Sequence, residues 1–257
     1  MRILVIASNY GVWAEELQGP WDALKEAGHD LTLATYLGKT PLPGVISMDP
    51  QFVDPMQKVK MNPPELLARV NQILDTGEWA DPIRTRDADM GDYDALVIVG
   101  GAGSALDVAG SGLVHRLVLD AYKSGKTIGA LCYAVAALAF TRDPDDGMRS
   151  VIHGRHVTAH PHAWDFVEDL EYDVVRATPD NPRLQLRTSG FVFPLQYMVQ
   201  DAVGPDGTVA SDPRTSREHP SVVHDHPFVT GLSVESAQAF GAKLVEVLSR
   251  DPVSAHA

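Results

Sequence analysis

The chain has a single cysteine, Cys132, at the point where a short apolar run gives way to an alanine-rich segment. Residues 126–131 are typical of a strand, and residues 133–140 have helical character. A strand that turns abruptly into a helix places the residue at the turn beside the free N–H groups of the first helical turn, which are expected to lower the pKa of a thiol. The small residues Ala130 and Ala134 fit the crowded turn of a nucleophile elbow with Cys in place of Ser. The alternative is a free cysteine buried as a small apolar residue.

Two carboxylates are expected at the same edge of the sheet. Residues 2–7 form an apolar run suited to a strand buried on both faces, and residues 14–27 have the spacing of a helix that Gly28 ends. Glu15 and Glu16 then lie in the first turn of that helix, just past the carboxyl end of the strand. One acid suffices to complement the helix dipole. The other is free to point toward a cleft at the sheet edge, where ligands bind in such folds.

A third feature at this edge is the glycine-rich end of another apolar run. Residues 93–99 predict a buried strand, and Gly100, Gly101 and Gly103 follow it. Glycines at a strand end let the backbone turn sharply and present bare N–H groups to a ligand. The pattern is not G-x-G-x-x-G opening a helix, so it does not predict dinucleotide binding.

Histidines that could exchange a proton with a thiolate end a short predicted strand. They are His160 and His162, although the ten histidines of the chain make a surface-loop role an open alternative for each. A second group, between residues 219 and 226, contains three histidines and an aspartate, which are ligand types that suit zinc. Its spacing matches no closed structural site. We therefore expect a solvated loop and no metal.

The composition excludes several classes of protein. A formal net charge of −13 over 257 residues, with a pI near 5.1, argues against a nucleic-acid or anionic-membrane partner. The longest apolar runs fall short of the ~18 residues that a membrane span needs. The first apolar run is too short for a signal peptide. One cysteine cannot form an intramolecular disulfide, so we expect a protein of the reducing cytoplasm.

The order of the predicted elements indicates an α/β domain. The strand, helix and strand within residues 2–34 open a parallel sheet, and strands and helices alternate again after residue 92. The alternation stops between residues 35 and 92, which are rich in proline. So long an excursion predicts an inserted cap on a single domain, residues 1–257. Trp13 is a candidate to line the cleft under that cap.

Together these segments resemble the ThiJ/PfpI superfamily, within the class-I glutamine amidotransferase-like group. The matching segments, in this order and spacing, are 14–28, 93–101, 129–132 and 154–158, and the terminal helix continues the match. The insertion is similar to that of the heat-shock chaperone/glyoxalase III branch.

The resemblance implies a doubly wound, mainly parallel sheet of the flavodoxin-like kind, a homodimer, a small-molecule substrate and no cofactor. It implies that Cys132 is the nucleophile and that a protonated Glu16 is hydrogen-bonded to it. The backbone N–H groups of Gly101 and Tyr133 would form the oxyanion hole.

One residue departs from the glyoxalase III branch. Tyr133 stands where that branch places its catalytic histidine, directly after the cysteine. Residues 157–161 instead resemble the Parkinsonism-associated branch, where a histidine before a proline lies near the cysteine. We therefore predict that His160 is the proton shuttle, with His162 as the reserve, and that Trp13, Tyr133 and His162 bind substrate.

The leading functional prediction is a cofactor-independent cysteine enzyme that acts on a small electrophile. The reaction would be a glyoxalase III-like conversion of a 2-oxoaldehyde, or a related lyase or hydratase reaction. One alternative is a stress chaperone or cysteine redox sensor, because an accessible thiolate oxidises readily. The second alternative is an amidase- or peptidase-type hydrolase or an isonitrile hydratase.

Overall fold

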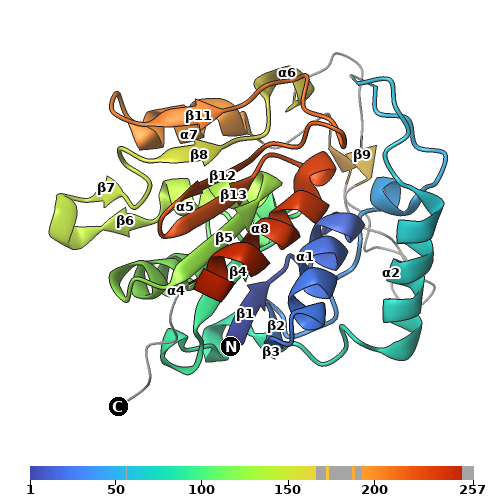
Figure 1. Cartoon of the computed structure of the whole chain (residues 1–257), viewed down its shortest axis with the longest axis horizontal. Coiled ribbons are helices and arrows are strands. Elements are labelled where there is room, and N and C mark those ends of the chain that lie inside the picture. The colour runs from blue at the N-terminus through green and yellow to red at the C-terminus, as the bar shows by residue number, and fades with distance from the viewer. Residues whose placement is uncertain (56, 166–171, 174–186, 189–192, 251–257) are drawn as a thin grey trace.

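A seven-stranded sheet forms the centre of the computed structural model, which describes residues 1–55, 57–165, 172–173, 187–188 and 193–250 (Figure 1). The strands lie in the order β12-β13-β5-β4-β1-β2-β3, and all neighbours are parallel except β12 and β13. Their bounds are β1 Arg2–Ile6, β2 Asp30–Thr35, β3 Ile83–Arg84, β4 Ala95–Ile98, β5 Thr127–Leu131, β12 Val222–Asp225 and β13 Phe228–Gly231.

The central strands are buried because helices cover both faces of the sheet. Helices α1 (Ala14–Glu26) and α8 (Ala237–Arg250) pack against each other on one face, and α4 (Gly112–Lys123) and α5 (Val135–Phe140) pack together on the other (Figure 1). Strands β4, β5 and β13 have no exposed residue, and β4 is apolar throughout, as expected of a strand buried on both faces. Each fully buried aliphatic side chain contributes roughly 1.5–3 kcal/mol to folding.

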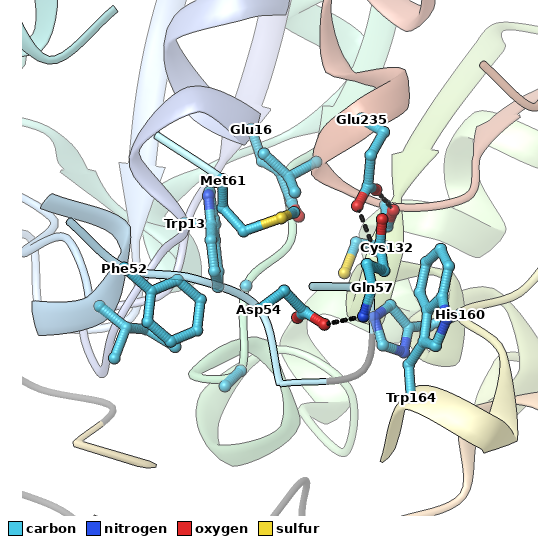
Figure 2. A pocket seen from close by; sticks show the side chains of 15 residues that line it. Trp13, Glu16, Phe52, Asp54, Gln57, Met61, Cys132, His160, Trp164 and Glu235 are labelled. Atoms are coloured by element: carbon cyan, nitrogen blue, oxygen red, sulfur yellow. Dashed lines mark hydrogen bonds between the residues drawn. The ribbon is translucent and has the colours of Figure 1, made fainter. Parts of the chain in front are cut away.

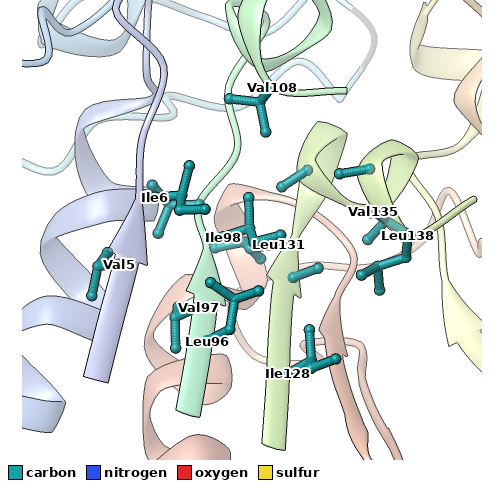
Figure 3. Packing of buried hydrophobic residues seen from close by; sticks show 14 of the residues in the cluster. Val5, Ile6, Leu96, Val97, Ile98, Val108, Ile128, Leu131, Val135 and Leu138 are labelled. Atoms are coloured by element: carbon teal, nitrogen blue, oxygen red, sulfur yellow. The ribbon is translucent and has the colours of Figure 1, made fainter. Parts of the chain in front are cut away.

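The core lies between the strands and the helix that follows Cys132. Figure 3 shows Ile6, Ile98 and Leu131 from three neighbouring strands beside Val135 and Leu138 of α5. All five are fully buried or nearly so. The alanine-rich sequence of this helix lets it pack closely on the sheet. The core thus fixes the position of the turn that carries the cysteine.

The strand order reverses beside β1, the first strand in sequence. The next strand along the chain, β2, lies on one side of β1, and β4 lies on the other. The series β2-β1-β4-β5-β13 has the flavodoxin-like order, with β3 and β12 added at the two edges. In such sheets ligands bind outside the carboxyl ends of the strands near this reversal. The prediction of a doubly wound, mainly parallel sheet is confirmed.

The insertion predicted at residues 35–92 contains three different kinds of structure. Helix α2 (Pro64–Thr76) packs on α1, and β3 extends the sheet at its edge (Figure 1). Pro64 at the first position and Gly77, with φ +72°, set the two ends of α2. Residues 44–62, including the 3₁₀ helix Val45–Met48, supply walls of the pocket described below.

A smaller layer is built from the segments that follow α5. Strand β8 (His156–Thr158) pairs in parallel with β11 (Thr208–Ala210) and is tied to the main sheet by a hydrogen bond from the Thr158 N–H to Thr230 Oγ1. The other elements are α3 Ser104–Asp107, α6 His162–Asp165, α7 Leu195–Val203, β6 Arg142–Asp143, β7 Arg149–Ser150, β9 Tyr172–Asp173, β10 Arg187–Thr188 and the 3₁₀ helices Thr85–Asp87, Met90–Asp92, Cys132–Ala134, Pro144–Asp146 and Val234–Ser236. Within the described residues, no helix has the length and apolar character to cross a membrane.

Candidate active site

Cys132 lies on a strained turn at the carboxyl end of β5. Its φ is +55°, in the left-handed region that residues other than glycine rarely adopt. Such strain persists only where the surrounding structure imposes it, and here the core holds both the strand and the following helix. The side chain is buried, with the residue 4% exposed. The elbow geometry expected from the sequence is therefore present.

Glu16 is the acid that reaches the cysteine. It is 1% exposed, it is hydrogen-bonded to Cys132, and it receives a hydrogen bond from the Gly101 N–H. Burial raises the pKa of Glu16 well above its usual value. Glu16 Oε2 is buried without a hydrogen-bond partner. A protonated carboxyl group that donates to the sulfur fits this environment.

Glu15 has a structural partner instead. Its two carboxylate oxygens accept hydrogen bonds from Arg217 Nη1 and Nη2, both at 2.6 Å, and Nη2 also donates to the Met61 carbonyl at 2.7 Å. Glu15 thus connects α1 to the inserted segment through Arg217. Glu16 is therefore the acid at the cleft, whereas Glu15 is buried in an ion pair instead of complementing the helix dipole at the surface.

The two glycines after β4 leave room for the cysteine and its acid. A Cβ atom on Gly100 would lie 2.3 Å from the Leu131 carbonyl oxygen and 2.4 Å from Glu16 Oε2. Gly101 has a φ of +103°, and a Cβ atom there would lie 2.2 Å from the Trp13 nitrogen. Neither position accepts a larger residue without a backbone shift.

Two backbone N–H groups are directed at the sulfur of Cys132. They belong to Gly101 and Tyr133, the two donors predicted for the oxyanion hole. Burial raises the pKa of the Cys132 thiol, a charged Glu16 would raise it further, and the two N–H groups lower it. The structure thus gives a raised pKa where the sequence predicted a lowered one. The reason is that the sulfur is enclosed and lies against a carboxyl group, which the sequence pattern alone does not show.

His160 forms a buried hydrogen-bonded pair with Asp165. The distance from His160 Nδ1 to Asp165 Oδ1 is 2.5 Å, and the Asp165 side chain is completely buried. The imidazole ring is 5.4 Å from the ring of Tyr133 and 5.3 Å from that of Trp164. Asp165 therefore fixes the orientation of the ring, which packs between two aromatic side chains. Sequence reasoning missed Asp165, although a carboxylate at the end of the helical turn after His160 was a usable signal.

The pocket in front of Cys132 has a cavity volume of about 30 Å³ (Figure 2). The residues that line it are Trp13, Glu16, Ile46, Phe52, Asp54, Gln57, Met61, Gly101, Ala102, Cys132, His160, Trp164, Ser233, Val234 and Glu235. Five of these come from the inserted segment, which closes the pocket on one side. So small and partly apolar a space suits a small ligand.

Glu235 reaches the pocket because β13 is in register with β5. Gly231 pairs with Leu131, so the residues after the two strands leave the sheet at the same level. Glu235 Oε1 accepts a hydrogen bond from Gln57 Nε2 at 2.5 Å, and Oε2 accepts one from Ser233 Oγ. Its place after a buried strand was a signal in the sequence that our reasoning did not use.

The predicted substrate-binding residues differ in their placement. Trp13 lines the pocket and packs edge-on against Phe52, with 6.3 Å between ring centroids. The Tyr133 side chain is fully buried outside the lining, next to the His160 ring, and its hydroxyl donates to the Phe193 carbonyl. His162 also lies outside the lining and stacks on Tyr197 at 4.5 Å. The described part of the chain brings together no His, Cys, Asp and Glu cluster suited to a metal ion.

The fold and this pocket define a class of α/β proteins in which a buried cysteine and a carboxylic acid meet at the carboxyl edge of a flavodoxin-like sheet. Residues 1–247 match the DJ-1/PfpI family, and the chain belongs to that family. No curated protein matches the sequence.

Solved structures of similar fold cover nearly the whole chain. Rapid Encystment Protein 24 KDa of Francisella tularensis has 18% sequence identity and a TM-score of 0.70, over 96% of this chain and 98% of that one. Glyoxalase III from Candida albicans has 16% identity and a TM-score of 0.67, over 96% of both chains. DJ-1beta of Drosophila melanogaster has 21% identity and a TM-score of 0.53, over 97% of this chain and 91% of that one. At these low sequence identities, the similarity to the three structures supports the fold of this chain.

Proposed function

We propose that this protein is a cofactor-independent enzyme that converts a small 2-oxoaldehyde and water into a 2-hydroxy acid through Cys132. The observation that carries the proposal is that one small pocket is lined by Cys132, the acid Glu16 and His160, whose imidazole is bonded to Asp165 outside the lining. A nucleophile with a nearby, oriented base is the arrangement that covalent catalysis needs. The similar fold of the protein described as glyoxalase III from Candida albicans supports the same reaction class.

The chemistry begins with addition of the Cys132 sulfur to the aldehyde carbon. The sulfur–carbon bond forms, and the aldehyde oxygen takes a proton to give a hemithioacetal. Glu16 stabilises the thiolate by donating a hydrogen bond. The Gly101 and Tyr133 N–H groups then stabilise the negative charge that develops on the substrate oxygen, and removal of one such donor typically costs ~2.7–4 kcal/mol.

An internal proton transfer follows, in which the aldehyde carbon is oxidised and the neighbouring ketone carbon is reduced. His160 removes the proton from the aldehyde-derived carbon and returns it to the adjacent carbon, which yields a thioester of the 2-hydroxy acid. Asp165 holds the imidazole in place for this step through the bond to Nδ1. Water then hydrolyses the thioester, releasing the acid and the free thiol.

The experiment is a turnover assay with methylglyoxal, no added thiol and lactate as the measured product. We expect lactate formation by the wild type and none by Cys132→Ser. Phe140→Ala, at a partly exposed residue outside the pocket lining, is the matched control and is expected to keep the wild-type rate. Equal lactate formation by Cys132→Ser, or none by the wild type, would refute the proposal.

A second candidate function is hydrolysis of an amide or hydration of an isonitrile. The buried His160–Asp165 pair favours it, since a cysteine with an oriented histidine also suits acyl transfer. A panel of small amides and isonitriles in the same assay distinguishes the two. A redox-sensing role has less support, because Cys132 is enclosed, whereas redox-sensor cysteines are solvent-accessible.

A further inference from the structure

Among its described lining residues, the active-site pocket has three acidic groups and one basic side chain, His160, which is bonded to Asp165. Glu16, Asp54 and Glu235 are its carboxyl-bearing residues, and none of the described residues that line it is a lysine or an arginine. Figure 2 shows Asp54 and Glu235 near Cys132, each joined to Gln57 by a hydrogen bond. Glu16 adds a buried oxygen, Oε2, that has no hydrogen-bond partner.

Glu235 is held in this position by donors on both of its oxygens. Gln57 Nε2 donates to Oε1 at 2.5 Å and Ser233 Oγ donates to Oε2. Burial raises the pKa of Glu235, while the hydrogen bond from Gln57 and the charges of His160 and Arg217 act in the opposite direction. Asp54 accepts a hydrogen bond from the Gln57 N–H at 2.7 Å. Gln57 thus fixes both acids, one through its side chain and one through its backbone.

Arg217 is the arginine whose charge acts on Glu235, and its two terminal nitrogens are already engaged. It binds Glu15 with two hydrogen bonds and the Met61 carbonyl with a third. It lies in the wall of a neighbouring surface hollow, which it shares with Gln57 and Glu235. A carboxylate that entered the active-site pocket would lose its hydration beside three carboxyl groups, which is strongly unfavourable, and the basic side chain in the described lining, His160, is already bonded to Asp165. An uncharged group would not incur this cost.

We propose that the pocket selects uncharged electrophiles and rejects those that bear a carboxylate, with Glu235 and Asp54 as the residues that set this selectivity. Within the proposed function, on which it rests for the identity of the reacting atom, this restricts the substrates to uncharged 2-oxoaldehydes. Apolar walls formed by Trp13, Phe52 and Met61 favour the same class.

The test compares alkylation of Cys132 by iodoacetamide and iodoacetate, which have nearly the same size and differ in charge. Each forms a carbon–sulfur bond and releases iodide, and the single cysteine makes the reaction readable by intact mass. The reference is the ratio of the two rates in the urea-unfolded chain. We expect the folded protein to favour iodoacetamide by at least about tenfold more than the unfolded chain, the size expected when an unpaired charge meets acidic groups at short range.

Two isosteric variants test the assignment of the residues. Glu235→Gln and Asp54→Asn should each lower the preference for iodoacetamide at least about threefold, as expected when one of the interacting charges is removed. Glu26→Gln, an exposed acid on α1, should leave it unchanged. A melting curve for each variant verifies folding, and Asp54 is the less buried of the two sites.

Three outcomes would overturn the proposal. They are a ratio equal to that of the unfolded chain, a ratio that neither variant alters, and a thiol that reacts with neither reagent, since the pocket would then admit neither class. Alkylation needs no turnover, so it is independent of the proposed reaction. Selective alkylation without lactate formation would refute the reaction and leave the selectivity standing. Lactate formation without selective alkylation would refute the selectivity and leave the reaction standing.

Discussion

Asp165 provides the sharpest test of how the site works, because its only described role in the pocket is to hold His160. The bond from His160 Nδ1 to Asp165 Oδ1 is 2.5 Å long, and the side chains are 9% and 0% exposed. In serine protease triads the carboxylate that orients the histidine is worth about 10⁴ in kcat. We expect Asp165→Asn to lower kcat for methylglyoxal by about 10² to 10⁴, or about 3–5 kcal/mol of activation free energy. KM should change little, because Asp165 lies outside the pocket lining.

The assay is steady-state lactate formation at one pH, combined with a mutant cycle. If Asp165 acts through His160, the double variant Asp165→Asn, His160→Gln should be no slower than His160→Gln alone. Asp143→Asn is the matched control. Asp143, on β6, is also a nearly buried aspartate, and it forms an ion pair with Lys123. This variant should keep the wild-type kcat. A kcat for Asp165→Asn within threefold of wild type, or fully additive losses in the double variant, would refute the reasoning.

Three further predictions concern stability and access to the site. Because burial raises the pKa of Glu16 in the folded state, its contribution to stability is full below the unfolded value of 4.5 and is lost as pH rises through the folded pKa. The free energy of unfolding of the wild type should therefore fall relative to that of Glu16→Gln as pH rises from 4.5 to the folded pKa, by up to about 1.4 kcal/mol per pH unit. A difference that does not vary with pH would contradict this. Gly100→Ala should lower the rate of Cys132 alkylation at least about tenfold and cost about 1–3 kcal/mol, because its Cβ would meet the Leu131 carbonyl oxygen at 2.3 Å. Wild-type reactivity of that variant would show that the turn is not tightly packed. Arg217→Met should destabilise the fold by about 1–3 kcal/mol in urea unfolding, since it leaves Glu15 buried without its partner. Arg214→Met, at an exposed ion pair, is its control and should unfold as the wild type does.

The sheet could be predicted from the sequence because its strands are continuous apolar runs. Residues 2–7 and 93–99 were predicted as strands, and the structure has β1 at Arg2–Ile6 and β4 at Ala95–Ile98. The helix predicted at 14–27 is α1, which spans Ala14–Glu26. Such segments carry their own signal, since burial on both faces requires unbroken apolar sequence. Strand β3 has only two residues, Ile83–Arg84, and could not be recognised by any periodicity.

The prediction of which residues meet in the site used two kinds of information, the topology and the resemblance. Cys132, Glu16 and Gly101 each follow the carboxyl end of a predicted strand, so the topology alone brings them to one edge. His160 was placed by resemblance and lies in the same pocket. The roles predicted for these residues remain predictions.

The residues that were not foreseen reach the pocket through tertiary contacts. Glu235 depends on the register of β13 against β5, and Gln57 reaches it from a loop nearly two hundred residues away in sequence. The direction of the Cys132 pKa likewise depends on how deeply the sulfur is enclosed. No local pattern encodes these properties, because they arise from packing between distant segments.

The most direct test of the central claim is to identify the covalent intermediate on Cys132. Enzyme quenched with acid during methylglyoxal turnover would be digested, and the peptide that contains Cys132 analysed by mass spectrometry before and after hydroxylamine, which cleaves thioesters. We predict a substrate adduct on Cys132 that hydroxylamine removes and that His160→Gln forms but does not convert to a thioester. Lactate formation without any adduct on Cys132, or an adduct confined to another residue, would contradict the account.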